Sequence, residues 1–325
     1  MNLRKFLVVR GFQILITFFI ILTLLFVLFR MAPGDPVAML TDPMMTDEEV
    51  QLLKQQFGLD QPLHRQYLLY LWNFVQGEFG LSFHYRQPVV AILADRLPKT
   101  ALLFTTATIL YAIAGISWGK ILAWKRGSLL DTSVSFIGLL THTFFLPWLA
   151  LIVIWIFGYQ LDWFPLNGMI SPEVWLDPES GWFRKALDVA HHMVLPMGVL
   201  FLTHFGGYTL VMRSTMLETL REDYILTARA KGLPERVIRN HHAAPNAALP
   251  VVTSLGLSLA FSINGGAITE TIFSWPGLGR ELVSSVSNGD YPLAQAAFLL
   301  IAGFVLVANL VVDVIYAYLD PRIRY

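Results

Sequence analysis

Apolar residues gather in six long runs along the chain, and polar or charged residues separate them. The runs cover residues 11–29, 101–124, 132–157, 191–212, 251–272 and 293–319. An α-helix rises about 1.5 Å per residue, so about 20 apolar residues are enough to cross the hydrocarbon core of a bilayer. The pattern therefore predicts an all-α, polytopic membrane protein with six transmembrane helices.

The first run has the apolar character of a signal peptide, but it is longer than the apolar core that such peptides use. The residues that follow it, "RMAPGDP", lack the small-x-small pattern of a cleavage site. We therefore expect the first run to remain as an anchor.

Lysine and arginine are unevenly distributed among the segments that flank the runs. Most of them precede the first run, follow the second, lie in segment 213–250 or end the chain. Cytoplasmic loops carry an excess of these residues. The distribution predicts that both termini and the loop 213–250 are cytoplasmic.

The same pattern predicts how the chain is organised. We expect a cytoplasmic tail and first transmembrane helix in residues 1–30, an extracytoplasmic helical segment in 31–100, a five-helix core in 101–320 and a cytoplasmic tail in 321–325. The segment 31–100 is either a lid that rests on the bilayer or a docking surface for an external partner. Its two expected apolar helix faces consist of Val50, Leu53 and Phe57, and of Tyr67, Leu68, Leu71 and Phe74 or Val75.

Two shorter loops are expected on the same side as this segment. Residues 158–190 contain Trp163, Trp175 and Trp182, and tryptophan is typical of the membrane–water interface. Residues 273–292 contain Gly and Pro pairs, which predict a re-entrant or interfacial turn.

Composition supports a membrane environment. The chain is 55% hydrophobic and 14% charged, whereas soluble domains carry roughly 25% charged residues. Membrane lipid is thus an expected partner, and a net charge of zero gives no indication of nucleic acid. The absence of cysteine excludes disulfides and cysteine-based metal or redox chemistry.

The sequence contains no convincing catalytic, cofactor or metal motif. Adjacent histidines on a helix diverge by about 100°, so the two His-His pairs at 191–192 and 241–242 are poor chelators. The stretch "GISWGKI" at 115–121 departs from a phosphate-binding loop at its first glycine and at its Ser/Thr position. Gly115 and Gly119 fit better as a close contact between two membrane helices. We therefore expect no enzyme activity, no metal site and no ATP site in this chain.

Four polar residues within or beside the apolar runs are candidates for a translocation path, because polar groups at membrane depth are costly and frequently functional. The alternative for each is a satisfied packing contact inside the helix bundle. No series of carboxylates suggests a proton relay. The four are His204, Asn264, Glu270 and Asp313.

The loop 213–250 combines charge with helix-forming residues. We expect a helix from Met216 to Lys231, with an apolar stripe of Leu217, Leu220, Tyr224 and Ala228. Gly232 then suits the position after a helix end, and Pro234 suits the first turn of a second helix. Small residues at 228, 230 and 232 would let the first helix enter a groove on a partner. The alternative is an ordinary solvated loop.

The loop also resembles a known family. "DYILTARAKGL" followed by "NAALPVV" is similar to the EAA-type loop of ABC importer permeases, and its "TARAKG" to the peptide-permease branch. In this sequence Leu226 and Thr227 replace the Glu and first Ala of the family pattern, so the family's carboxylate is missing. Ala228, Gly232 and Pro245 match it, while His242 and Ala244 depart from it.

Further segments resemble the same branch in the expected order. They are "RMAPGDP", "FGLDQPLHRQY", "GEFGLSF", "PVVAILADRLPKT", "ITETIFSWPGLGREL" and "DVIYAYLDPRIRY". The resemblance implies a type I (MetI-like) permease fold. It also implies that a coupling helix enters a cleft on an ATPase. The residues that it assigns to this coupling are Asp223, Tyr224, Thr227, Ala228, Arg229, Ala230, Lys231, Gly232 and Leu233.

The resemblance implies a transport subunit in the inner (plasma) membrane of a prokaryote. The implied partners are a second, homologous permease subunit, two ABC ATPase subunits that bind ATP and Mg, and an extracytoplasmic substrate-binding protein. Peptides are the favoured substrate, and oligosaccharides or metal chelates are the alternatives. An ion-coupled secondary carrier is a further alternative, but such carriers usually have more helices or inverted repeats.

Overall fold

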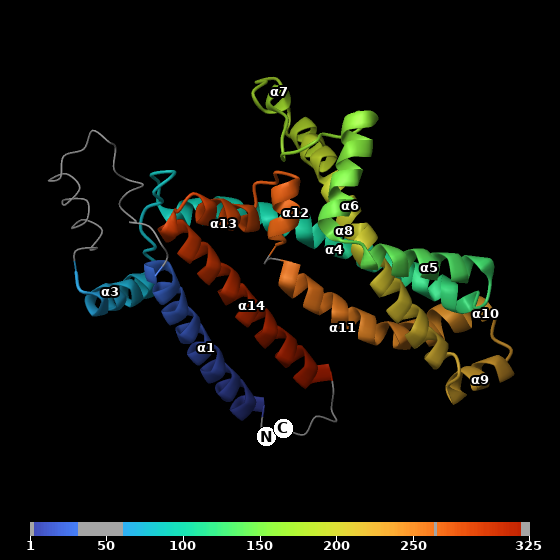
Figure 1. Ribbon diagram of the computed structural model, residues 1–325. Coiled ribbons are helices and arrows are strands. Elements are labelled where there is room, and N and C mark those ends of the chain that lie inside the picture. Colours follow the sequence, from blue (N-terminus) through green and yellow to red (C-terminus); the bar gives the residue numbers. More distant parts are fainter. Residues whose placement is uncertain (1–2, 32–60, 263–264, 320–325) are drawn as a thin grey trace. The chain divides into compact units, whose positions relative to one another are not determined.

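The computed structural model describes residues 3–31, 61–262 and 265–319, which are almost entirely helical (Figure 1). Within these ranges the only extended pairing is an isolated bridge between Leu81 and Pro88. The chain forms two compact units. We call Met1–Thr100 with Pro276–Tyr325 the terminal unit, and Ala101–Trp275 the central unit.

The terminal unit contains α1 (Leu3–Met31), α3 (Leu63–Gln76), the start of α4 (Val89–Trp124), α13 (Leu278–Ser287) and α14 (Tyr291–Leu319). Helices α1 and α14 lie side by side (Figure 1), and the Phe29 ring contacts the rings of Tyr291 and Phe298. Arg10 of α1 forms an ion pair of 3.1 Å with Asp313 of α14. Polar and aromatic contacts thus hold the two membrane helices together.

Helix α3 packs on α1 through one face. The Tyr67 hydroxyl lies 2.7 Å from Thr23 Oγ1, and its ring contacts Phe26. Of the predicted apolar face, Leu71 and Phe74 are partly buried and Phe74 contacts the Phe18 ring, whereas Leu68 and Val75 are exposed, at 63% and 76%. The role of this segment as a lid or a docking surface stays a prediction. The other predicted face, at Val50, Leu53 and Phe57, lies outside the described residues.

Two buried carboxylates connect the elements of the terminal unit. Asp290 accepts hydrogen bonds from the Ser82 hydroxyl and from the backbone N–H groups of Phe83 and His84. Glu281 of α13 accepts a 2.9 Å hydrogen bond from Arg96 near the start of α4. Both carboxylates are nearly inaccessible to solvent, so these contacts compensate the cost of burying charge.

The central unit contains most of α4 (Val89–Trp124) and is organised around α8 (Trp182–Thr219). The other elements are α5 (Leu129–Thr143), α6 (Leu146–Val153), the π-helix η1 (Ile154–Gln160), α7 (Pro172–Trp175), α9 (Asp223–Ala230), α10 (Glu235–Val237), the π-helix η2 (Ile238–Ala243), α11 (Ala244–Ser262) and α12 (Ala267–Ile272).

Glycines allow the helices of the central unit to approach closely. A methyl group added to Gly115 or Gly119 of α4 would overlap Tyr208 or Met212 of α8. The predicted close helix contact at these two glycines is therefore confirmed. A second contact joins Gly138 of α5 to Gly206 of α8, backbone against backbone.

The structure confirms a helical protein built from membrane-length apolar elements, but two predicted spans are not single helices. Among the described residues, five helices are long and apolar enough to cross a membrane, and a sixth span exists there only if α5 and the α6–η1 segment count as one despite a bend of 105°. Phe144 and Phe145 are extended there, because Pro147 in the first turn of α6 cannot continue a preceding helix.

The second interruption falls within the predicted run 251–272. Helix α11 ends at Ser262, and the separate helix α12 begins at Ala267. The intervening Gly265 has a φ of 68°, a conformation that glycine adopts without strain and that does not occur within an α-helix.

Candidate functional site

The predicted coupling segment forms its own short helix, α9, just after α8. The expected continuous helix from Met216 to Lys231 is wrong, because α8 ends at Thr219 and α9 begins at Asp223. Glu222 between them has extended backbone angles, with φ −69° and ψ 146°. Asp223 then lies in the first turn of α9, where a negative charge favours the helix dipole.

One face of α9 is anchored in the core of the central unit. Ile225 is 0% exposed and Ala228 is 5% exposed, and both pack in a cluster that includes Met212 and Met216 of α8 and Ile238 of η2. A helix of eight residues is not stable alone in water, so this contact fixes its position.

The burial of Ala228 corrects the predicted docking face. Ala228 contacts the chain's own core, so Ala230 and Gly232 are the small residues that remain exposed. Leu233 is half-buried against the same cluster, and Tyr224, expected in the apolar stripe, is 39% exposed.

The turn after α9 follows the prediction. Gly232 has a φ of +73°, its N–H bonds the Arg229 carbonyl at 2.9 Å, and the Leu233 N–H bonds the Ala228 carbonyl at 3.3 Å. This is the expected helix end with a left-handed glycine. Arg229 and Glu235 form an ion pair of 3.4 Å across the turn.

A side-chain hydrogen bond joins α9 to α11. Asn246 donates a 2.8 Å hydrogen bond to the Tyr224 hydroxyl. The Thr227 hydroxyl donates to the Asp223 carbonyl within α9 itself. Tyr224 therefore has a role in orienting α9, besides the docking role that the resemblance implies.

The outward surface of α9 is apolar at its centre and charged around it. Leu226 is 56% exposed, and Asp223, Ala230 and Lys231 are exposed as well. Exposed apolar side chains with a charged rim are typical of a protein-binding surface. Sequence reasoning treated Leu226 only as a departure from the family pattern. Its spacing from Asp223 and Ala230, three and four residues, could have placed it on the outward face.

A second group of polar residues lies within the membrane-length helices of the central unit. The ring of His204 in α8 stacks on Tyr111 of α4 with centroids 5.1 Å apart. One turn later, the Tyr208 hydroxyl donates to Ser258 Oγ of α11 at 2.8 Å and to the Ser254 carbonyl at 3.2 Å. The sequence prediction contained His204 but missed its partners. The four-residue spacings 204–208 and 254–258 were the available indication.

The remaining candidates for the path have different surroundings. Glu270 is fully buried in α12 of the central unit. Asp313 belongs to the terminal unit, where its ion pair with Arg10 matches the packing alternative. Asn264 lies outside the described residues.

Comparison with known proteins gives the same assignment as the motifs. Residues 115–325 match the family described as binding-protein-dependent transport system inner membrane component, and residues 3–104 match the family of its N-terminal region. The chain is 40% identical over 304 residues to the oligopeptide transport system permease protein AppB of Bacillus subtilis (strain 168), covering 92% of this chain and 93% of the relative.

Other relatives extend over almost the whole chain. The di/tripeptide transport system permease protein DppB of Pseudomonas aeruginosa (strain UCBPP-PA14) is 39% identical over 325 residues, with 95% of both chains covered. The dipeptide transport system permease protein DppB of Escherichia coli (strain K12) is 36% identical over 334 aligned positions, with 98% of both covered. The resemblance stated from the motifs is therefore confirmed, and the chain belongs to the family of binding-protein-dependent transport system inner membrane components, the permease subunits of ABC importers.

Proposed function

We propose that this chain is a permease subunit of an ATP-driven peptide importer and that it receives the force of ATP-dependent closure through α9. One observation carries the proposal: α9 is anchored on its inner face by Ile225 and Ala228 and exposes Leu226 on its outer face. An exposed apolar residue on a fixed base suits insertion into a groove of a partner protein.

The proposed assembly contains a second, homologous permease subunit, two ATPase subunits and an extracytoplasmic binding protein. The ATPase subunits bind ATP and Mg, and this chain binds neither. The loop 213–250 and both termini carry an excess of lysine and arginine, which supports a cytoplasmic location for these three segments. The membrane is proposed to be the inner membrane of a prokaryote. The translocation path is lined by both permease subunits and alternates between outward and inward access.

Peptides are the proposed substrate class. The relatives carry the names of oligopeptide, di/tripeptide and dipeptide permeases. His204 and Tyr208 with Ser258 offer hydrogen-bonding groups at membrane depth, and peptide groups need such partners because an unpaired amide is costly in an apolar environment.

Cysteine cross-linking tests the coupling surface directly, because the native chain has no cysteine. We would introduce single cysteines at Leu226 and Ala230 and treat native membranes with a short bifunctional reagent. Leu129, which is 84% exposed at the start of α5, is the matched control. We expect positions 226 and 230 to capture an ATPase subunit, with a yield that changes on ATP addition, while position 129 captures little.

Uptake of a labelled dipeptide tests the function. We expect Leu226→Asp to abolish ATP-dependent uptake with normal membrane levels, since a central apolar contact contributes about 2 kcal/mol or more to an interface. Equal capture at 129 and 226, together with normal uptake by Leu226→Asp, would disprove coupling through α9. Uptake that is stopped by a protonophore but not by ATP depletion would support an ion-coupled carrier instead.

A further inference from the structure

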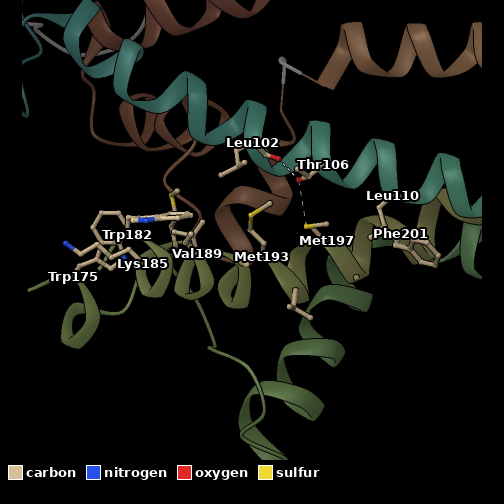
Figure 2. A pocket seen from close by; sticks show the side chains of 15 residues that line it. Leu102, Thr106, Leu110, Trp175, Trp182, Lys185, Val189, Met193, Met197 and Phe201 are labelled. Atoms are coloured by element: carbon tan, nitrogen blue, oxygen red, sulfur yellow. Dashed lines mark hydrogen bonds between the residues drawn. The ribbon is translucent and has the colours of Figure 1, made fainter. Parts of the chain in front are cut away.

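An apolar groove opens between α4 and α8 in the central unit (Figure 2). The two helices are in contact at Gly115 and Gly119, and the groove lies along the preceding part of both helices. Its lining residues on α8 run from Trp182 to Phe201, opposite Leu102 and Leu110 of α4. The cavity volume is about 1090 Å³.

The groove offers almost no polar group to a ligand along its length. The hydroxyl of Thr106 is already bonded to the Leu103 carbonyl of its own helix, and it also contacts the sulfur of Met197. Met193 and Met197 lie in the middle of the groove (Figure 2), and methionine adapts to flexible apolar ligands. A peptide in the groove would leave its amide groups without hydrogen-bond partners, whereas a hydrocarbon chain has no polar groups that need such partners.

One end of the groove has a different chemistry. Trp175, Trp182 and Lys185 gather there, while Leu110 and Phe201 lie at the other end (Figure 2). The Lys185 ammonium lies over the Trp175 ring, 5.4 Å from its centroid. Tryptophan and lysine together are typical of the level of the lipid headgroups, so this end is at the membrane surface and the rest of the groove is at acyl-chain depth.

The nearby carboxylates are already bonded within the chain. Asp188 accepts hydrogen bonds from the Ser171 N–H at 2.8 Å and from the Trp175 indole at 3.1 Å. Asp177 accepts from Ser180 and pairs with Arg184 at 3.3 Å. The Lys185 ammonium interacts with Asp177 at longer range, but among the described residues it is Arg184 that forms the ion pair with this carboxylate. Lys185 can therefore still bind an anionic group at the mouth of the groove.

We propose that this groove is a phospholipid site, in which an acyl chain lies between α4 and α8 and the phosphate binds Lys185. Residues 182 to 201 extend over about 28 Å at 1.5 Å per residue, enough for a headgroup and the roughly 15 Å of one hydrocarbon leaflet. A bound lipid would fill the space beside the glycine contacts and hold α4 and α8 at their observed separation.

The chemistry of the groove favours a lipid over a helix of another subunit. A phospholipid supplies both an acyl chain for the apolar lining and a phosphate for the lysine at its mouth.

Photolabelling with a lipid tests the proposal. The transporter would be purified through this chain, with the subunits that accompany it, and placed in phosphatidylethanolamine vesicles that contain phosphatidylglycerol with a diazirine in its acyl chain. After illumination, mass spectrometry would locate the label. We expect it on the segment 190–201 of α8.

Two glycines provide a matched pair of variants. A side chain at Gly198 meets no atom within 4 Å and would fill the groove, and one at Gly11 of α1 likewise meets no atom. Gly198→Leu should remove most of the label from 190–201, and Gly11→Leu should leave it unchanged. Lys185→Gln should reduce the preference for phosphatidylglycerol over phosphatidylethanolamine by about fivefold, the effect of one lysine at a charged membrane surface.

Three results would overturn the site. Equal labelling of the native chain and Gly198→Leu would mean ordinary contact with surrounding lipid. Displacement of the label by dipeptides would make the groove a substrate site. A benzophenone at Ala190 that captures a second membrane subunit, without lipid label, would make it a subunit interface. None of these readouts depends on ATPase coupling, so the site can fail while the transport function stands.

Discussion

Gly206 and Gly207 are neighbours in α8, and replacing each with alanine should affect stability in opposite directions. Alanine is the better helix former by about 1 kcal/mol, so Gly207→Ala, with no atom within 4 Å of the new methyl group, should be neutral or stabilising. A methyl group on Gly206 would instead lie 2.5 Å from the carbonyl carbon and 2.7 Å from the Cα of Gly138.

The size of the effect follows from what the methyl group meets. Carbon atoms pack at about 3.5–4.0 Å, so α5 must move by roughly 1 Å, and backbone atoms cannot rotate away as a side chain does. Overpacking costs about 1–3 kcal/mol, and we expect the upper end. The two variants should then differ by about 3 kcal/mol, or about 6–12 °C in Tm at 2–4 °C per kcal/mol.

Tryptophan fluorescence of the purified transporter during heating would measure the difference, because the chain contains nine tryptophans. Both variants must first be present in the membrane at comparable levels. A Tm for Gly206→Ala within about 2 °C of that for Gly207→Ala would refute the tight contact between α5 and α8.

Three other contacts lead to further expectations. Arg213 of α8 holds the buried Asp131 of α5 through two hydrogen bonds of 2.6 and 2.7 Å, so Arg213→Met should cost about 3–5 kcal/mol in the same assay, and adding Asp131→Asn should restore part of it. Ile225→Ala should cost about 2–5 kcal/mol and Ile225→Val at most about 1.5; similar losses would mean that α9 is not anchored at this residue. Asp290→Ala leaves the Ser82 hydroxyl and two backbone N–H groups without their acceptor, which we expect to cost about 1–3 kcal/mol and to increase proteolysis at residues 82–84.

The sequence predicted those parts of the fold that depend on local properties. The length of an apolar run determines whether a helix can cross a bilayer, and glycine determines where a helix ends, so the membrane-length helices and the turn at Gly232 were predictable. The contact at Gly115 and Gly119 was predictable because small residues four apart permit close approach of helices.

The direction of the helices and the side chains that each helix buries were not predictable in the same way. Hydropathy does not change when a chain bends, so the run 132–157 gave no sign of the 105° bend other than Pro147. Ile225 and Leu226 are neighbours of similar hydrophobicity, and only the position of α8 and η2 decides that the first is buried and the second exposed. The hydrogen bond from Tyr208 to Ser258 joins positions 50 residues apart, which no local pattern reveals.

The contacts of α8 suggest how movement at α9 would reach the membrane. Helix α9 is too short to be stable alone and is fixed to α8 through Ile225, Met212 and Met216. The Arg213–Asp131 pair then ties this part of α8 to α5. Closely packed interiors transmit displacement with little compression, so α9 should move together with α8. His204 lies on the same helix, two to three turns before Arg213. A force applied at Leu226 would therefore reach His204 through packed backbone, and the contacts of α8 should control coupling more strongly than the helical stability of α9.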